Sequence, residues 1–173
     1  MLKVGDKAPT FSLKAQDGRT YSLEKLKGMR VVLYFYPKDG TPGCTIESCN
    51  FRDRKGEFKV RGAEVLGISA DDLKSHALFS RKYRLNFPLL SDIGGKVSGK
   101  YGTWKEKKFL GKKFMGIQRS TFIIDEGGMI AGAFYNVNPL GHARGILNAL
   151  NVLPKNKRAG PQKMPRARKK KKR

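Results

Sequence analysis

Residues 31–53 read VVLYFYPKDGTPGCTIESCNFRD, and this stretch decides the fold. Its first six residues are β-branched, aromatic or leucine, which is typical of a fully buried strand. Pro37 ends the strand because proline has no N–H to donate, and the glycines and proline of residues 38–43 indicate a turn. A helical pattern starts at Cys44 and runs to about Val60. The sequence therefore predicts a buried strand, a turn, and a helix with a cysteine on its first turn.

The predicted position of Cys44 favours a reactive thiol. Unbonded backbone N–H groups and the positive end of the helix dipole lie at the first turn of a helix, and both stabilise a thiolate there. The alternative is a buried and inert thiol, which is the common state of an unpaired cysteine.

Cys49 follows five residues later, and the chain has no third cysteine. Positions i and i+5 of an ideal helix have Cα atoms roughly 8 to 9 Å apart, whereas a disulfide needs about 4.4 to 6.8 Å. The first turns must therefore unwind before the two thiols can bond. This spacing favours a reversible redox pair. The alternative is that Cys49 faces the core and that some other thiol reacts with the oxidised Cys44.

Several motifs, taken in order, resemble those of the peroxiredoxins. Pro37, Thr41 and Cys44 match the active-site pattern Pro-x-x-x-Thr-x-x-Cys. The wider block FYPKDGTPGCTIESCNFRD is similar to the Q-type, or bacterioferritin-comigratory-protein, subfamily, in which one helix carries both cysteines. The blocks FPLLSD at 87–92 and GIQRSTF at 116–122 fit the same subfamily. The resemblance covers about residues 1–153.

The resemblance implies an α/β, thioredoxin-like fold with a mixed central sheet, helices on both faces and an N-terminal β-hairpin. It also implies a thiol-dependent peroxidase that reduces hydrogen peroxide and organic hydroperoxides. Cys44 would become a sulfenic acid, and Cys49 would resolve it as an intramolecular disulfide. Thioredoxin or a similar dithiol would then restore both thiols. No bound cofactor is implied, and the expected oligomeric state is a monomer.

Further side chains are candidates for the same site. The Thr41 hydroxyl can hydrogen-bond a thiolate or a peroxide. Arg119 is a charge at an apolar strand entry, where its fixed cation and fork of donors would stabilise developing negative charge; the alternative is a surface arginine at a sheet edge. Pro37 and Pro42 would shape the pocket, or simply punctuate the turn. The resemblance suggests that Glu47 holds the network through an arginine, and the alternative is an exposed first-turn carboxylate.

The net charge of +23 is extreme, and residues 155–173 hold eleven Lys or Arg and no acid. We therefore expect two parts, a folded domain at 1–153 and a disordered basic tail at 154–173. The tail could bind nucleic acid through phosphates, act as a nuclear localisation signal in a eukaryote, or be only a solvated segment. The remainder of the chain is also basic, which slightly favours nucleic acid.

Other classes of function are weaker. No apolar run approaches the roughly 18 residues of a membrane span, and no secretory signal is visible. Two cysteines indicate a reducing compartment, so the expected location is cytoplasmic, or nuclear in a eukaryote. His76 and His142 have no ligand spacing around them, which makes a zinc site a poor hypothesis.

Two alternative functions stay open at this point. A thioredoxin-like disulfide reductase normally carries Cys-x-x-Cys, but here four residues separate the cysteines. A nucleic-acid-associated protein, with peroxidase activity secondary, would use the basic tail.

Hydrophobic patterning and turn residues predict the other elements. In order these are a hairpin (11–13 and 21–23), a helical turn (23–26), a strand (64–70), a helix from Asp71 or Asp72 to Tyr83 with Leu73, Ala77 and Leu78 as apolar points, a strand (87–90), a weak helix (94–101), a loop or hairpin (104–115), strands (121–125 and 129–135), and a helix from Asn138 or Pro139 to Val152 with Leu140, Ile146, Leu147 and Leu150 on one side.

Overall fold

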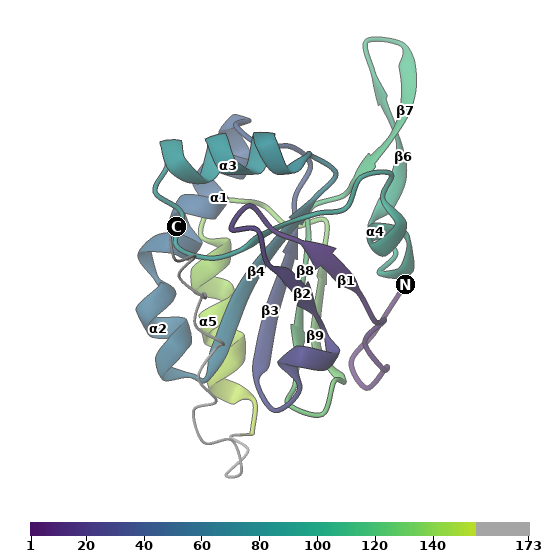
Figure 1. The fold of residues 1–173 in the computed structure, drawn as a ribbon. Coiled ribbons are helices and arrows are strands. Elements are labelled where there is room, and N and C mark those ends of the chain that lie inside the picture. The colour runs from purple at the N-terminus through teal and green to yellow at the C-terminus, as the bar shows by residue number, and fades with distance from the viewer. Residues whose placement is uncertain (155–173) are drawn as a thin grey trace, which may run out of the picture.

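The computed structural model describes residues 1–154, which form a layered α/β domain around one mixed sheet (Figure 1). The sheet has five strands in the order β5-β4-β3-β8-β9. Their bounds are β3 Arg30–Phe35, β4 Ala63–Ser69, β5 Leu89–Ser91, β8 Ser120–Ile124 and β9 Ile130–Tyr135. Strands β3, β4 and β5 run parallel, while β8 is antiparallel to both β3 and β9.

Strand β3 lies at the centre of this sheet, and all six of its residues are buried. Val32 pairs with Val65 on one side and with Ile123 on the other. A strand that is paired on both edges and covered on both faces has no solvent side, which explains its unbroken apolar sequence.

Both faces of the sheet are covered, as predicted. One face packs against α1 (Pro42–Asp53), α2 (Lys55–Val60), α3 (Leu73–Lys82) and α5 (His142–Val152). The other packs against the N-terminal hairpin of β1 (Ser12–Lys14) and β2 (Thr20–Ser22), the 3₁₀ turn η1 (Glu24–Leu26) and α4 (Lys96–Lys100). Figure 1 shows these two layers on either side of the strands. The core is therefore double, with alternate β3 side chains entering each half.

A second hairpin, β6 (Trp104–Phe109) and β7 (Lys112–Ile117), projects away from the domain (Figure 1). Its turn residues Leu110 and Gly111 both have positive φ, as a two-residue hairpin turn requires. The sequence left this region open between a loop and a hairpin.

Three boundaries of the predicted helices were wrong. The helix through Cys44 begins at Pro42, and the chain departs from helical geometry at Arg54, between α1 and α2. Helix α5 begins at His142, so Leu140 lies in the preceding loop and is 67% exposed.

In α3 the side that faces the sheet carries His76 and Phe79, not Leu73 and Leu78. The pattern was misread because it counted only apolar residues, whereas His76 is buried with polar partners.

None of the helices within residues 1–154 is long and apolar enough to cross a membrane. The predicted basic tail falls, from residue 155 onward, outside the described residues, and its boundary stays a prediction.

Candidate active site

Cys44 is the third residue of α1, and its side chain is buried. The chain leaves β3, makes a short loop, and enters α1 with Thr41 as the N-cap residue and Pro42 as the first helical residue. Proline suits that position because its missing N–H would have no intrahelical partner. The thiol therefore lies at the positive end of a twelve-residue helix, where the sequence placed it.

Arg119 reaches Cys44 from 75 positions along the chain. Ser120 pairs with Phe35 across β8 and β3, so the residue before Ser120 lies where the chain leaves β3. The guanidinium Nη2 donates to Cys44 Sγ at 3.3 Å, and Nη1 donates to Glu47 Oε2. One rigid fork thus joins the thiol to a carboxylate one helical turn further along α1.

Gly43 allows this close approach. A Cβ atom there would lie 3.3 Å from Arg119 Nη2 and 3.4 Å from Pro139 Cγ. Any larger residue at position 43 would push the guanidinium away from the start of the helix. From the sequence this glycine was predicted only as a turn residue, and nothing nearby in the sequence indicated the contact with Pro139.

The side chain of Glu47 is fully buried, so the alternative of an exposed first-turn carboxylate is wrong. Its Oε2 is bound by Arg119, whereas Oε1 has no hydrogen-bond partner among the described residues. Burial raises the pKa of Glu47 to about 7, and the charge of Arg119 acts in the opposite direction. The pair can therefore gain or lose a proton near neutral pH.

Thr41 does not contact the thiol as expected. Its hydroxyl donates to the Lys38 carbonyl at 3.0 Å, because the side chain closes the loop that precedes the helix. Its oxygen can still accept a bond, so a role toward a bound peroxide stays a prediction. Pro37 is half-buried directly after β3 and Tyr36, and its role in shaping the pocket also stays a prediction.

Cys49 is partly buried and lies on the same unbroken helix as Cys44. Both cysteines are free thiols in this structure. The intact helix keeps them in the i, i+5 relation that is too long for a disulfide, so the two thiols cannot bond while α1 is folded.

Comparison with known protein families matches residues 4–133 to the AhpC/TSA family. The chain belongs to this family. It is 46% identical over 149 residues to the peroxiredoxin Bcp of Escherichia coli, covering 86% of this chain and 96% of that protein. It is 47% identical over 149 residues to a Coxiella burnetii protein that is named as a putative peroxiredoxin, covering 86% of this chain and 99% of that protein.

Solved structures agree with this assignment. The bacterioferritin comigratory protein of Xanthomonas campestris, studied for alkyl peroxide reduction, superposes with a TM-score of 0.81 at 38% identity, over 86% of this chain and 98% of that one. A PrxQ mutant from Xylella fastidiosa superposes with a TM-score of 0.82 at 34% identity, over 87% of this chain and 96% of that one. The prediction of a Q-type peroxiredoxin with a thioredoxin-like fold is therefore confirmed, and the protein is a thiol peroxidase.

The peroxiredoxin has two further groups near the site that sequence reasoning missed. His142 contacts Thr121 Oγ1 through Nε2 at 2.8 Å, and burial, with the charge of Arg119, lowers its pKa to about 4. Lys107 lies on β6, where burial and the charge of Arg119 lower its pKa. No spacing in the sequence singles out either residue, because both approach only through the packing of β8 and of the projecting hairpin.

The titration of Glu47 gives this peroxiredoxin a testable pH dependence. The folded protein holds the proton up to about pH 7, whereas an ordinary glutamate releases it near 4.5. The resulting stabilisation is complete below pH 4.5 and is lost as the pH rises through 7. We expect the unfolding free energy of the wild type to fall by about 3 kcal/mol relative to Glu47→Gln across this window.

Urea unfolding of both proteins under reducing conditions, at several pH values in the window, measures this difference. The titration of His142 is common to both proteins and cancels in the comparison. A difference that stays constant with pH would contradict the assignment of the raised pKa to Glu47.

Proposed function

We propose that this peroxiredoxin reduces hydrogen peroxide and alkyl hydroperoxides, with Cys44 as the nucleophile. The observation that carries the proposal is the 3.3 Å contact between Arg119 Nη2 and Cys44 Sγ at the start of α1. A cation and the helix terminus together favour the thiolate, which is the form that attacks. The alkyl peroxide studied in the Xanthomonas campestris relative supports the choice of substrate class.

In the first step the Cys44 thiolate attacks the terminal oxygen of the peroxide. The S–O bond forms as the O–O bond breaks, and sulfur gives up the two electrons. The leaving oxygen takes a proton and departs as water or an alcohol, while Cys44 becomes a sulfenic acid. Arg119 would stabilise the negative charge that moves from sulfur to the leaving oxygen.

In the second step Cys49 attacks the Cys44 sulfenic acid, which releases water and forms the disulfide. This bond requires the first turns of α1 to unwind, because the intact helix holds the two Cα atoms too far apart. An outside dithiol, with thioredoxin as the expected donor, then returns two electrons and lets the helix reform. The enzyme would work as a monomer.

This arrangement argues against the disulfide reductase hypothesis. A reductase would need no cation beside its nucleophile. Here the buried Glu47 binds Arg119, and Gly43, which has no side chain, leaves room for the guanidinium.

Treatment with one equivalent of peroxide, followed by mass spectrometry of the digested protein, tests the proposal. We expect a bond that joins Cys44 to Cys49 within one chain, reversed by dithiothreitol, with a loss of helical circular dichroism in the oxidised form. A cross-link between two chains, or oxidised Cys44 beside a free Cys49 thiol, would rule out the proposed resolving step.

The hypothesis that the basic tail binds nucleic acid concerns residues 155–173, which lie outside the described residues, and it stays a prediction.

A further inference from the structure

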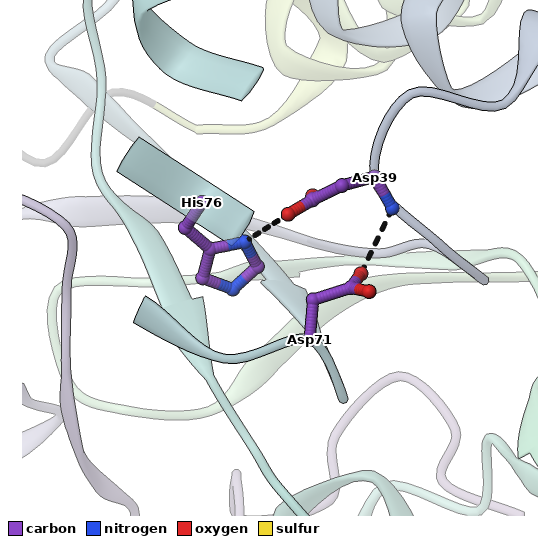
Figure 2. Close-up of side chains that lie close together, drawn as sticks. All are labelled: Asp39, Asp71 and His76. Carbon is purple, nitrogen blue, oxygen red and sulfur yellow. Dashed lines mark hydrogen bonds and ion pairs between the residues drawn. The ribbon is translucent and has the colours of Figure 1, made fainter. Parts of the chain in front are cut away.

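Asp39 lies in the loop between β3 and α1, and Figure 2 shows its contacts with His76 and Asp71. Its Oδ1 accepts a hydrogen bond from the Tyr36 hydroxyl at 2.6 Å. Its Oδ2 accepts from Ser75 Oγ at 2.7 Å and from His76 Nδ1 at 2.8 Å. Its backbone N–H donates to Asp71 Oδ2 at 2.8 Å. Four hydrogen bonds therefore converge on one loop residue.

The partners of Asp39 come from rigid elements of the fold. Tyr36 follows β3, Asp71 follows β4, and His76 lies in α3 with its Nε2 donating to the Leu90 carbonyl of β5 at 3.2 Å. Asp39 is thus tied to the carboxyl ends of the three parallel strands. Both ring nitrogens of His76 therefore have an oxygen partner, Nδ1 in Asp39 and Nε2 in the Leu90 carbonyl.

The central pair of this hydrogen-bond network is almost completely buried. The His76 side chain is fully buried, and that of Asp39 is 6% exposed. Hydrogen bonds to a charged group are stronger in such surroundings, and removal of one partner leaves the other buried without a partner.

Asp39 lies close to the start of α1, the helix that must unwind. Only Gly40, which is exposed and has φ of +72°, separates Asp39 from the N-cap residue Thr41. Because Asp39 is fixed, the start of α1 is held where Cys44 meets Arg119. If Asp39 were released, the unwound segment would extend back to the end of β3.

We propose that Asp39 and His76 form a clamp of positioning residues, which holds the first turn of α1 folded in the reduced enzyme. The clamp sets the equilibrium between the helical form, in which Cys44 can meet peroxide, and the unwound form, in which Cys44 and Cys49 bond. This inference rests on the proposed function, since the disulfide is its readout.

A metal ion is an alternative occupant of this cluster. One ligand atom each from Asp39, Asp71 and His76 lie within 4.8 Å of one another. The four hydrogen bonds at Asp39 already engage these groups, and the Ser69 hydroxyl also donates to Asp71 Oδ2 at 2.6 Å. The geometry therefore favours a closed hydrogen-bond network.

The test is the midpoint potential of the Cys44–Cys49 pair in dithiothreitol redox buffers, with the full chain and the variants Asp39→Ala and His76→Leu. Loss of the clamp makes unwinding easier, so the disulfide becomes more stable relative to the dithiol. We expect a three- to tenfold change in the equilibrium constant, which for tenfold corresponds to a shift of about 30 mV to more negative potential. The same variants should form less sulfinic acid at excess peroxide, because resolution is faster.

Three further variants separate the clamp from a general loss of stability. Asp72→Ala removes the carboxylate that caps α3 by accepting from the Ser75 backbone N–H, but it leaves Asp39 untouched, so its potential should stay that of the wild type. His76→Asn keeps a donor toward Asp39 and should restore most of the wild-type potential. Ser75→Ala removes one hydrogen bond and should give a smaller shift in the same direction, which provides a measurement even if His76→Leu does not fold.

Each remaining outcome is decisive. A wild type that forms no Cys44–Cys49 bond refutes the proposed function, whereas unchanged potentials in Asp39→Ala and Ser75→Ala refute the clamp alone. An equal shift in Asp72→Ala refutes it as well, because the effect would then be loss of α3 stability. A wild-type potential that moves with added zinc chloride, but not in Asp39→Ala, would replace the clamp by a cation site.

Discussion

Cys44→Ser is expected to lose peroxide turnover by more than about a thousandfold, since removal of a nucleophile is among the largest single effects in enzymes. A serine hydroxyl is almost wholly protonated near neutral pH and is a much weaker nucleophile than a thiolate. Arg119 and the helix terminus would remain in place, but they would have no anion to activate. Peroxide consumption with a saturating dithiol measures the loss, and turnover retained by this variant would rule out the mechanism.

Cys49→Ser is the matched control for the nucleophile. Its Cys44 keeps the contact with Arg119, so we expect one equivalent of peroxide to be consumed in a burst at close to the wild-type rate. Turnover with a protein dithiol should then stop. A second equivalent of peroxide should oxidise Cys44 to the sulfinic acid, because no neighbouring thiol intercepts the sulfenic acid. A missing burst would mean that Cys49 acts before resolution.

Arg119→Gln is expected to lower the second-order rate constant with peroxide by about a hundred- to a thousandfold, the usual effect of removing one preorganised donor from a developing charge. The variant loses the donor 3.3 Å from Cys44 Sγ. It also removes the partner of the buried Glu47, which should cost about 1–3 kcal/mol of folding stability. Stopped-flow measurement of thiol oxidation gives the rate, and urea unfolding gives the stability.

A double variant separates these two effects of Arg119. Arg119→Gln with Glu47→Gln replaces the buried carboxyl by a neutral amide, so we expect stability to recover while the rate constant stays low. Recovery of both would show that Arg119 acts only by holding the fold. Arg119→Lys keeps the charge but cannot bind Cys44 Sγ and Glu47 Oε2 with one planar group. Its rate constant should lie between those of the wild type and Arg119→Gln.

The successes and errors of prediction have different physical origins. The strand, the turn and the place of Cys44 on the first turn of a helix were read correctly from residues 31–53, because proline, glycine and a continuous apolar run act over a few residues. The apolar side of α3 was misread, because the buried His76 is satisfied by Asp39 and Leu90, which lie elsewhere in the sequence. The bond from Thr41 to Lys38 was also missed, because a hydroxyl can choose among several nearby acceptors.

Local sequence was therefore sufficient to place Cys44 at a helix start and to set the five-residue interval that keeps Cys49 out of bonding range, since both depend only on helix geometry. The surroundings of the thiol were decided by tertiary structure. The antiparallel pairing of β8 with β3 brings Arg119 to the end of the central strand, and the parallel neighbours β4 and β5 bring the partners that fasten Asp39. Such contacts join residues far apart in the chain, and only the register of the sheet determines which of them meet.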